Sequence, residues 1–160
     1  MFSKISLAAG ILALSASATF AQASGGHAAP PEPFTYHSDS DLQALAIKPG
    51  AAPTIKMLSD HENYFVEVVG RTQSGEPEFH SHWIDYIIVQ RGDGTLTYGH
   101  MNTGAKDSGH GEMRGGKITD GKSIDLHPGD YFEVPAGLWH QIALKPGTTA
   151  FRYMVVKIRQ

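Results

Sequence analysis

The sequence predicts an all-β domain, either a β-sandwich or a small barrel, and two observations lead to this class. Short apolar or alternating stretches recur every eight to twelve residues or so after residue 50, and turns rich in glycine and proline separate them. No helical pattern lies between these stretches, which argues against a parallel α/β sheet. The chain has 160 residues, a length that suits one domain with a real core.

The N-terminus has the features of a secretory signal peptide over residues 1–23. Lys4 precedes the apolar stretch ISLAAGILALSASATF, and the AQA that ends at Ala23 offers small residues for cleavage. The alternatives are an uncleaved anchor or a core helix, but serines interrupt the stretch and it is short for a membrane span. We expect a mature chain that begins at Ser24, is periplasmic or secreted, and has no stable membrane association.

After the cleavage site the sequence predicts a flexible lead-in over 24–37 and then one domain over 38–160. SDSDLQALAI, at 38–47, predicts one short helix, which either Ser38 or Asp39 would cap and which KPG would end. Residues 99–116 hold six glycines and no alternation, which we interpret as a long mobile or functional loop. Strands are predicted at TIKML, YFVEVV, EFHSHW, IDYIIVQ, TLTY, KSIDL, YFEVPA, WHQIAL and AFRYMVVKI.

Composition excludes several classes of function. The formal net charge of −3 has the wrong sign for a nucleic-acid binder or a surface drawn to anionic lipid, and no basic block occurs. The absence of cysteine excludes disulfides, zinc-finger sites, iron–sulfur clusters and cysteine nucleophiles. Nine histidines are present. A metal site in this chain would therefore use imidazole and carboxylate ligands.

The stretch EFHSHWIDYIIVQRGDG, residues 78–94, carries a candidate metal site. On a strand, His80 and His82 would share one face, and two imidazoles in an apolar interior would need a partner such as a divalent cation. An isolated pair of this kind is more often exposed to solvent. This pair is followed by Asp85, whose face of the next strand also carries Ile87 and Val89.

A second stretch, GDYFEVPAGLWH, has the turns and the histidine of a matching site. Gly129 suits a turn with an unusual backbone angle, and Pro135 with Gly137 predicts a tight corner. His140 then opens a strand on which Ile142 would point to the same side.

Together, the two stretches resemble the paired motifs of the cupin superfamily, G-x5-H-x-H-x3-4-E-x6-G and G-x5-P-x-G-x2-H-x3-N. The second motif matches from Gly129 to His140, with Leu144 in place of its final Asn. The resemblance covers about residues 50–158.

The first motif matches less closely. His80, His82 and the six-residue gap between Asp85 and the following glycine fit the pattern. Gly75 lies one residue too close to His80, only two residues separate His82 from the acid, and the acid is Asp rather than Glu.

The resemblance implies a double-sheet jelly-roll β-barrel that binds one divalent transition metal, which could be Fe, Mn, Ni, Cu or Zn. His80, His82 and His140 are the implied ligands. Asp85 is either a fourth ligand or a group that orients a histidine or a metal-bound water. Relatives of this kind commonly pair, so a homodimer is expected.

Two classes of function fit these predictions. One is an enzyme that acts on a small organic substrate, as an oxygenase, decarboxylase, lyase or isomerase, with the metal carrying the chemistry. The other is a module that binds a metal or small ligand without turnover. Trp139 could border the pocket but is expected in the core, and His100 and His110 are expected to be exposed rather than part of a lid.

Overall fold

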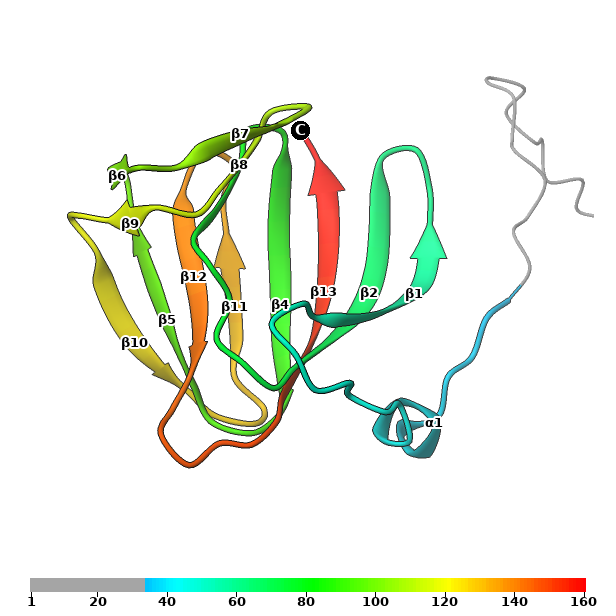
Figure 1. The fold of residues 1–160 in the computed structure, drawn as a ribbon. Helices are drawn as coiled ribbons and strands as arrows, with labels where there is room; N and C mark the ends of the chain where they lie inside the picture. Colours follow the sequence, from blue (N-terminus) through cyan, green and yellow to red (C-terminus); the bar gives the residue numbers. More distant parts are fainter. Residues whose placement is uncertain (1–33) are drawn as a thin grey trace, which may run out of the picture. The chain divides into compact units, whose positions relative to one another are not determined.

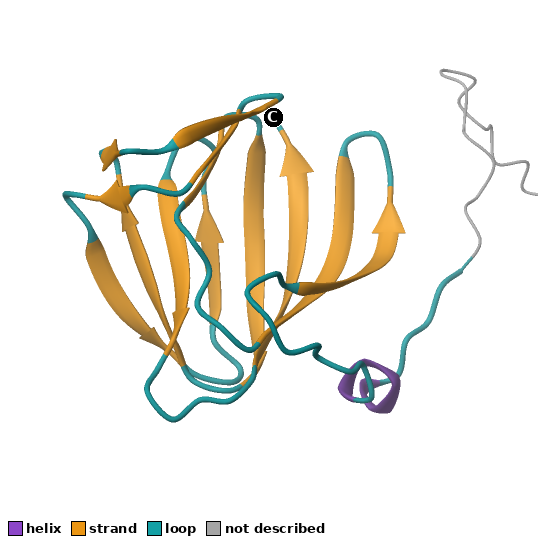
Figure 2. Ribbon diagram, in the orientation of Figure 1, coloured by secondary structure: helices purple, strands orange, loops and turns teal. Residues whose placement is uncertain are grey.

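Almost every residue after Pro53 lies in or between antiparallel strands in a computed structural model that describes residues 34–160. The predicted signal peptide and most of the lead-in lie outside the described residues. Figure 2 shows the short helix to one side of the strands. The elements are α1 (Asp39–Gln43), β1 (Thr54–Asp60), β2 (Tyr64–Arg71), β3 (Glu78–His80), β4 (Trp83–Arg91), β5 (Gly94–Gly99), β6 (Asn102–Thr103), β7 (Lys106–Gly109), β8 (Glu112–Arg114), β9 (Lys117–Ile118), β10 (Lys122–Leu126), β11 (Tyr131–Val134), β12 (Trp139–Leu144) and β13 (Phe151–Arg159).

The strands form two main sheets whose inner faces are packed together (Figure 1). One sheet has the order β1-β2-β13-β4-β11, and the other has the order β10-β5-β12-β3-β8-β7. A third, short sheet consists of β6 and β9, which lie in the chain between strands of the six-stranded sheet. Every pairing is antiparallel, and most neighbours are distant in sequence, as in a double-sheet jelly roll. This architecture confirms the predicted fold class.

The core consists of the inward-facing residues of both sheets. On β4 the alternation is clear, because Asp85, Ile87 and Val89 are all buried while Ile88 between them is exposed. Burial of each large apolar side chain contributes roughly 1.5–3 kcal/mol, so apolar packing holds the barrel together. The buried cluster comprises Val69, Ile87, Val89, Leu96, Leu126, Ile142, Phe151, Tyr153 and Val155.

Helix α1 begins where the sequence predicts and ends earlier. Ser38 caps it through a capping box with Asp41, whose backbone N–H donates to the Ser38 hydroxyl. The helix stops at Gln43 rather than near residue 47. Buried Arg152 donates to the backbone carbonyls of Leu42 and Gln43, 2.7 and 3.2 Å away, and so satisfies the helix end after little more than one turn.

The glycine-rich segment 99–116 forms short strands instead of the long loop that its composition predicts. Strands β7 and β8 make a hairpin, and β8 pairs with β3 in the six-stranded sheet. Gly109, His110 and Gly111 all have positive φ angles, of 86, 54 and 80°, which turn the chain tightly. Strand β3, which pairs with β8, lies outside the segment, so the segment's own pattern does not reveal that pairing. Within residues 34–160, no helix has the length and apolarity needed to cross a membrane.

Candidate metal centre

Strands from both sheets bring five ionisable side chains together inside the barrel. In the six-stranded sheet, β3 carries Glu78 and His80 on one face, and His140 on β12 lies directly opposite Glu78. In the five-stranded sheet, Asp85 on β4 lies directly opposite Lys157 on β13. The register of these strand pairs, more than any single segment, therefore assembles the site.

Three of the residues expected from the sequence meet in this place. The Nε2 atom of His80 lies 3.5 Å from Oδ2 of Asp85, and the Nε2 atom of His140 lies 3.7 Å from the same oxygen. Each of the three residues is at most 4% exposed. The two imidazole rings are 5.1 Å apart between centroids. Both histidines thus direct the same ring nitrogen at one buried carboxylate.

Contacts behind the two histidines determine which nitrogen faces the centre. Nδ1 of His80 bonds to the carboxylate of Glu112, which lies opposite His80 on β8. Nδ1 of His140 donates to the backbone carbonyl of Leu138, 3.2 Å away. With Nδ1 engaged as a donor, each Nε2 keeps its lone pair for the interior, as in metal-binding histidines.

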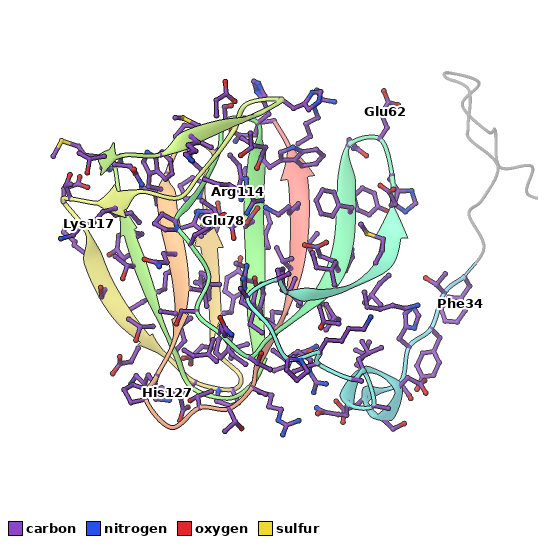
Figure 3. All side chains as sticks on the ribbon, in the orientation of Figure 1. Phe34, Glu62, Glu78, Arg114, Lys117 and His127 are labelled. Atoms are coloured by element: carbon purple, nitrogen blue, oxygen red, sulfur yellow. The ribbon has the colours of Figure 1, made fainter. Side chains whose placement is uncertain are left out.

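Glu78 is the fourth acidic or imidazole group at the centre. Its side chain bridges two arginines, accepting from Arg71 at 3.2 Å and from Arg114 at 3.0 Å, and Figure 3 shows Glu78 beside Arg114. Burial alone would raise the pKa of Glu78, but the charges of Arg114 and Arg71 help to hold that pKa below its usual value. Glu78 is therefore an ionised carboxylate next to His80 and His140.

Lys157 occupies the middle of the group. Its Nζ lies 2.8 Å from Nε2 of His80 and 2.8 Å from each carboxylate oxygen of Asp85. The Lys157 side chain is only 12% exposed. An ammonium ion therefore meets the lone pair of one histidine and the buried carboxylate at the same time.

The surroundings of the centre favour the ionised form of Asp85 and the neutral form of His140. Burial alone would raise the pKa of Asp85, but the adjacent positive charge of Lys157 helps to lower it to about 2. Burial lowers the pKa of His140 below its usual value, despite the attraction of Asp85. At neutral pH the centre thus offers carboxylate oxygens and an unprotonated His140 nitrogen.

A cavity of about 310 Å³ opens beside these residues. One part of its wall is charged and includes Glu67, Glu78, Asp85, Arg71, Arg114 and Lys157. The rest is mostly apolar and comes from both sheets. Trp139 does not line it but is buried against Phe79, with ring centroids 5.2 Å apart, in agreement with the expected core position. The apolar wall residues are Pro53, Ile55, Val69, Ile87, Ile142 and Val155.

Comparison with solved structures decides the fold. A cupin superfamily protein from Desulfitobacterium hafniense matches with a TM-score of 0.51 and 15% identity, over 74% of this chain and 87% of that one. The cupin domain of Cnp3 from Schizosaccharomyces pombe matches with a TM-score of 0.54 and 15% identity, over 74% of this chain and 72% of that one. The chain has the cupin fold. A candidate mannose-6-phosphate isomerase from Ralstonia eutropha matches with a TM-score of 0.55 and 17% identity, over 79% of this chain and all of that one.

Comparisons at the level of sequence give no further assignment. No protein-family model matches the chain, and no curated protein matches it either. At identities below 20%, the structural matches establish the cupin fold and leave the activity open.

His82 is the one predicted ligand that the structure does not bring to the centre. Strand β3 ends at His80, so the alternation assumed for His80 and His82 does not continue, and His82 is exposed in the turn before β4. A different register of the cupin motif fits the geometry. Glu78 and His80 take the two histidine positions, and Asp85 then follows His80 after four residues, which is a permitted spacing.

The residues present fit a divalent transition metal. Ligand atoms of Glu78, His80 and His140 lie within 4.8 Å of one another, and Asp85 lies closer still to both histidines. Ligand atoms about 2.1 Å from one tetrahedral ion are roughly 3.4 Å apart, so the group needs only a small contraction. Imidazole with carboxylate suits zinc, iron, nickel and manganese alike, which leaves the identity of the metal open.

Sequence reasoning missed Glu78, Glu112 and Lys157. Glu78 had a usable signal, because it stands two residues before His80 and therefore shares its face. Glu112 lies in the glycine-rich segment, 32 residues from His80 in sequence, and Lys157 lies 72 residues from Asp85. No local pattern connects these pairs.

Proposed function

We propose that this chain is an exported, metal-dependent cupin that acts on a small organic substrate. One observation carries the proposal. His80 and His140 are both held through Nδ1 and both direct Nε2 toward the carboxylate of Asp85, and His140 and Asp85 line the cavity. A structural ion pair would not need two imidazoles prepared in this way, whereas a metal centre does.

The chain's own residues have distinct roles in this proposal. His80, His140, Asp85 and Glu78 would hold the metal, and Glu112 keeps His80 in its orientation. A bound divalent ion supplies Lewis acidity and positions a substrate oxygen. The apolar wall around Ile87, Ile142 and Val155 excludes water from the substrate's carbon skeleton, while the arginines of the cavity suit an acidic or phosphorylated substituent.

Glu67 supports a reaction that includes proton transfer. It lines the same cavity, and burial raises its pKa above the usual value despite the opposing charge of Lys157. A buried carboxyl group in the wall of such a cavity is placed to accept a proton from a bound substrate and to return it. This position favours lyase or isomerase chemistry over an oxygenase, and a candidate sugar-phosphate isomerase is among the structural matches.

The test has two stages. Protein freed of metal by chelation is titrated with Mn²⁺, Ni²⁺ and Zn²⁺ by calorimetry, and a single strong site is expected that His140→Ala removes. The loaded protein is then incubated with sugar phosphates, hydroxy acids and phenols, with turnover followed by NMR and an oxygen electrode. Absence of any metal binding contradicts the proposed centre. Binding of a small molecule without its turnover favours the alternative below.

The alternative is a cupin that binds a small ligand without turnover. The observation that favours it is the ammonium group of Lys157, which already neutralises the centre without an ion. A cupin of this kind would show saturable ligand binding in the absence of metal. Ligand titration of chelator-treated protein therefore separates the two functions.

A further inference from the structure

The ammonium group of Lys157 uses the same atoms that a metal would need. Its Nζ lies 2.8 Å from Nε2 of His80 and 2.8 Å from both oxygens of Asp85. Nε2 of His80 has one lone pair, because Nδ1 is engaged by Glu112. That lone pair accepts from Lys157 or binds a metal ion, but it does not do both.

The strand register keeps Lys157 in this position. Lys157 and Asp85 are directly opposite on β13 and β4, so their Cβ atoms are close and the ammonium group reaches the carboxylate without crossing the cavity. The contact is buried, where solvent screens it little. The side chains of the centre are therefore assembled around an internal cation.

We propose that Lys157 is an internal competitor for the metal centre, and that a divalent ion binds by displacing its ammonium group from His80 and Asp85. This inference rests on the proposed metal-dependent function. It assigns each carboxylate of the centre its own cationic partner, because Lys157 pairs with Asp85 while Arg71 and Arg114 pair with Glu78. It also means that metal binding includes the cost of moving Lys157.

Glu67 provides a place for the displaced ammonium group. Glu67 lies opposite Val155 on the paired strands β2 and β13, so it is a diagonal neighbour of Lys157 on the same inward face. Such positions are about 7–8 Å apart between backbones, within reach of a lysine side chain. Both residues line the cavity. Lys157 thus keeps a carboxylate partner after displacement, and its charge then lies in the space that a substrate would enter.

Metal affinity measured by calorimetry tests the competitor role. Lys157→Met and Lys157→Gln remove the charge while keeping much of the length, and chelator-treated protein is titrated with Mn²⁺, Ni²⁺ and Zn²⁺ at one fixed pH. If Lys157 fills the centre in nine of ten molecules or more, both variants bind metal about tenfold more tightly or better than wild type. Lys145→Met is the matched control, because Lys145 pairs with Asp125 on the surface. It should bind like wild type, and circular dichroism confirms the fold of each variant.

The outcomes separate this inference from the proposed function. Tighter binding by either folded Lys157 variant supports the competitor role, including the case where wild type binds no metal and the variant does. Equal or weaker binding by the variants, with a wild-type protein that binds metal, overturns the role and leaves the proposed function standing. If neither wild type nor any folded Lys157 variant binds metal, the competitor role and the proposed function both fail.

A double-mutant comparison tests the destination of the ammonium group. Glu67→Gln removes the carboxylate that receives Lys157, so it should weaken metal binding more in wild type than in Lys157→Met. Equal losses in the two backgrounds would mean that Glu67 acts on the metal by charge alone, and would overturn the assigned destination.

Discussion

Glu112 and His80 face each other across the β3–β8 ladder, and the Glu112 carboxylate holds Nδ1 of the imidazole. This contact turns the other ring nitrogen of His80 toward Asp85 and Lys157. The residue that orients the histidine thus comes from the glycine-rich segment, which is distant in sequence from either cupin-like motif.

Glu112→Gln should weaken metal binding by roughly 10–100-fold, because the loss of a carboxylate behind a ligating histidine loosens its orientation and lowers its basicity. Calorimetric titration with Zn²⁺ measures the change. Glu133→Gln removes an exposed carboxylate from β11 and should leave the affinity unchanged. Equal affinities for Glu112→Gln and wild type would show that the contact has no part in metal binding.

His80→Ala and His140→Ala should each abolish most metal binding while the barrel stays folded, because the fold depends on apolar burial and the ion on a few ligands. Metal content after reconstitution is measured by mass spectrometry of the elements.

His82→Ala distinguishes between the two ways of aligning the chain with the first cupin motif, one with His82 as a ligand and one without it. The structure places His82 outside the centre, so His82→Ala should keep a near-normal metal content. His110→Ala, at another exposed turn residue, is the control. A loss of metal from His82→Ala alone would show that His82 is a ligand.

Acid should destabilise the metal-free protein through Asp85. Its pKa is lowered from 3.8 to about 2 in the folded state, so its stabilising effect is complete above pH 4 and is lost as the pH falls toward 2. A difference of nearly two pKa units corresponds to about 2 kcal/mol in the free energy of unfolding. Urea titrations at a series of pH values measure this effect. Asp85→Asn should have a flatter profile over the same range, and a profile parallel to wild type would contradict the assignment.

Export should remove residues 1–23. Protein produced in a bacterium with an intact secretion pathway should be recovered from the periplasm or medium with Ser24 as its first residue, which mass spectrometry of the intact chain measures. Replacing Ala21 and Ala23 with bulky residues should block processing. Recovery of an unprocessed chain from the cytoplasm would contradict the predicted signal peptide.

Self-association should occur through β1. Within the described residues this strand pairs only with β2, and Ile55 and Met57 on it are 53% and 43% exposed. Light scattering at micromolar concentration should give the mass of a dimer, and Met57→Lys should give a monomer. Ile124→Lys, on an edge of the other sheet, is the matched control. A monomeric wild-type protein would exclude the dimer.

The parts of this structure that follow from local pattern were predictable. Alternation placed Asp85, Ile87 and Val89 on one buried face, and glycines at 129 and 137 adopt the positive φ angles that their turns require. The sequence also offered Ser38 as one of two possible caps of the helix, and Ser38 is the one that caps it. In each case the deciding interaction lies within a few residues along the chain.

The pairings that complete the centre were not predictable in this way. Lys157 meets Asp85 because β13 inserts between β2 and β4 in one particular register, and a shift by one residue would turn its side chain to the other face. The assumption that β3 continues to His82 failed for a similar reason, because only the three-dimensional path shows where that strand ends.

The β7–β8 hairpin contributes side chains to the candidate metal centre but none to the apolar core of the barrel. It carries Glu112 and Arg114, which contact His80 and Glu78, yet all four residues of β7 are exposed, and neither hairpin strand contributes to the buried core cluster. Changes in its length or composition would therefore alter the basicity of one ligand and the charge at the cavity wall without disturbing the apolar packing of the barrel. Related chains could acquire different chemistry by replacing this one peripheral segment.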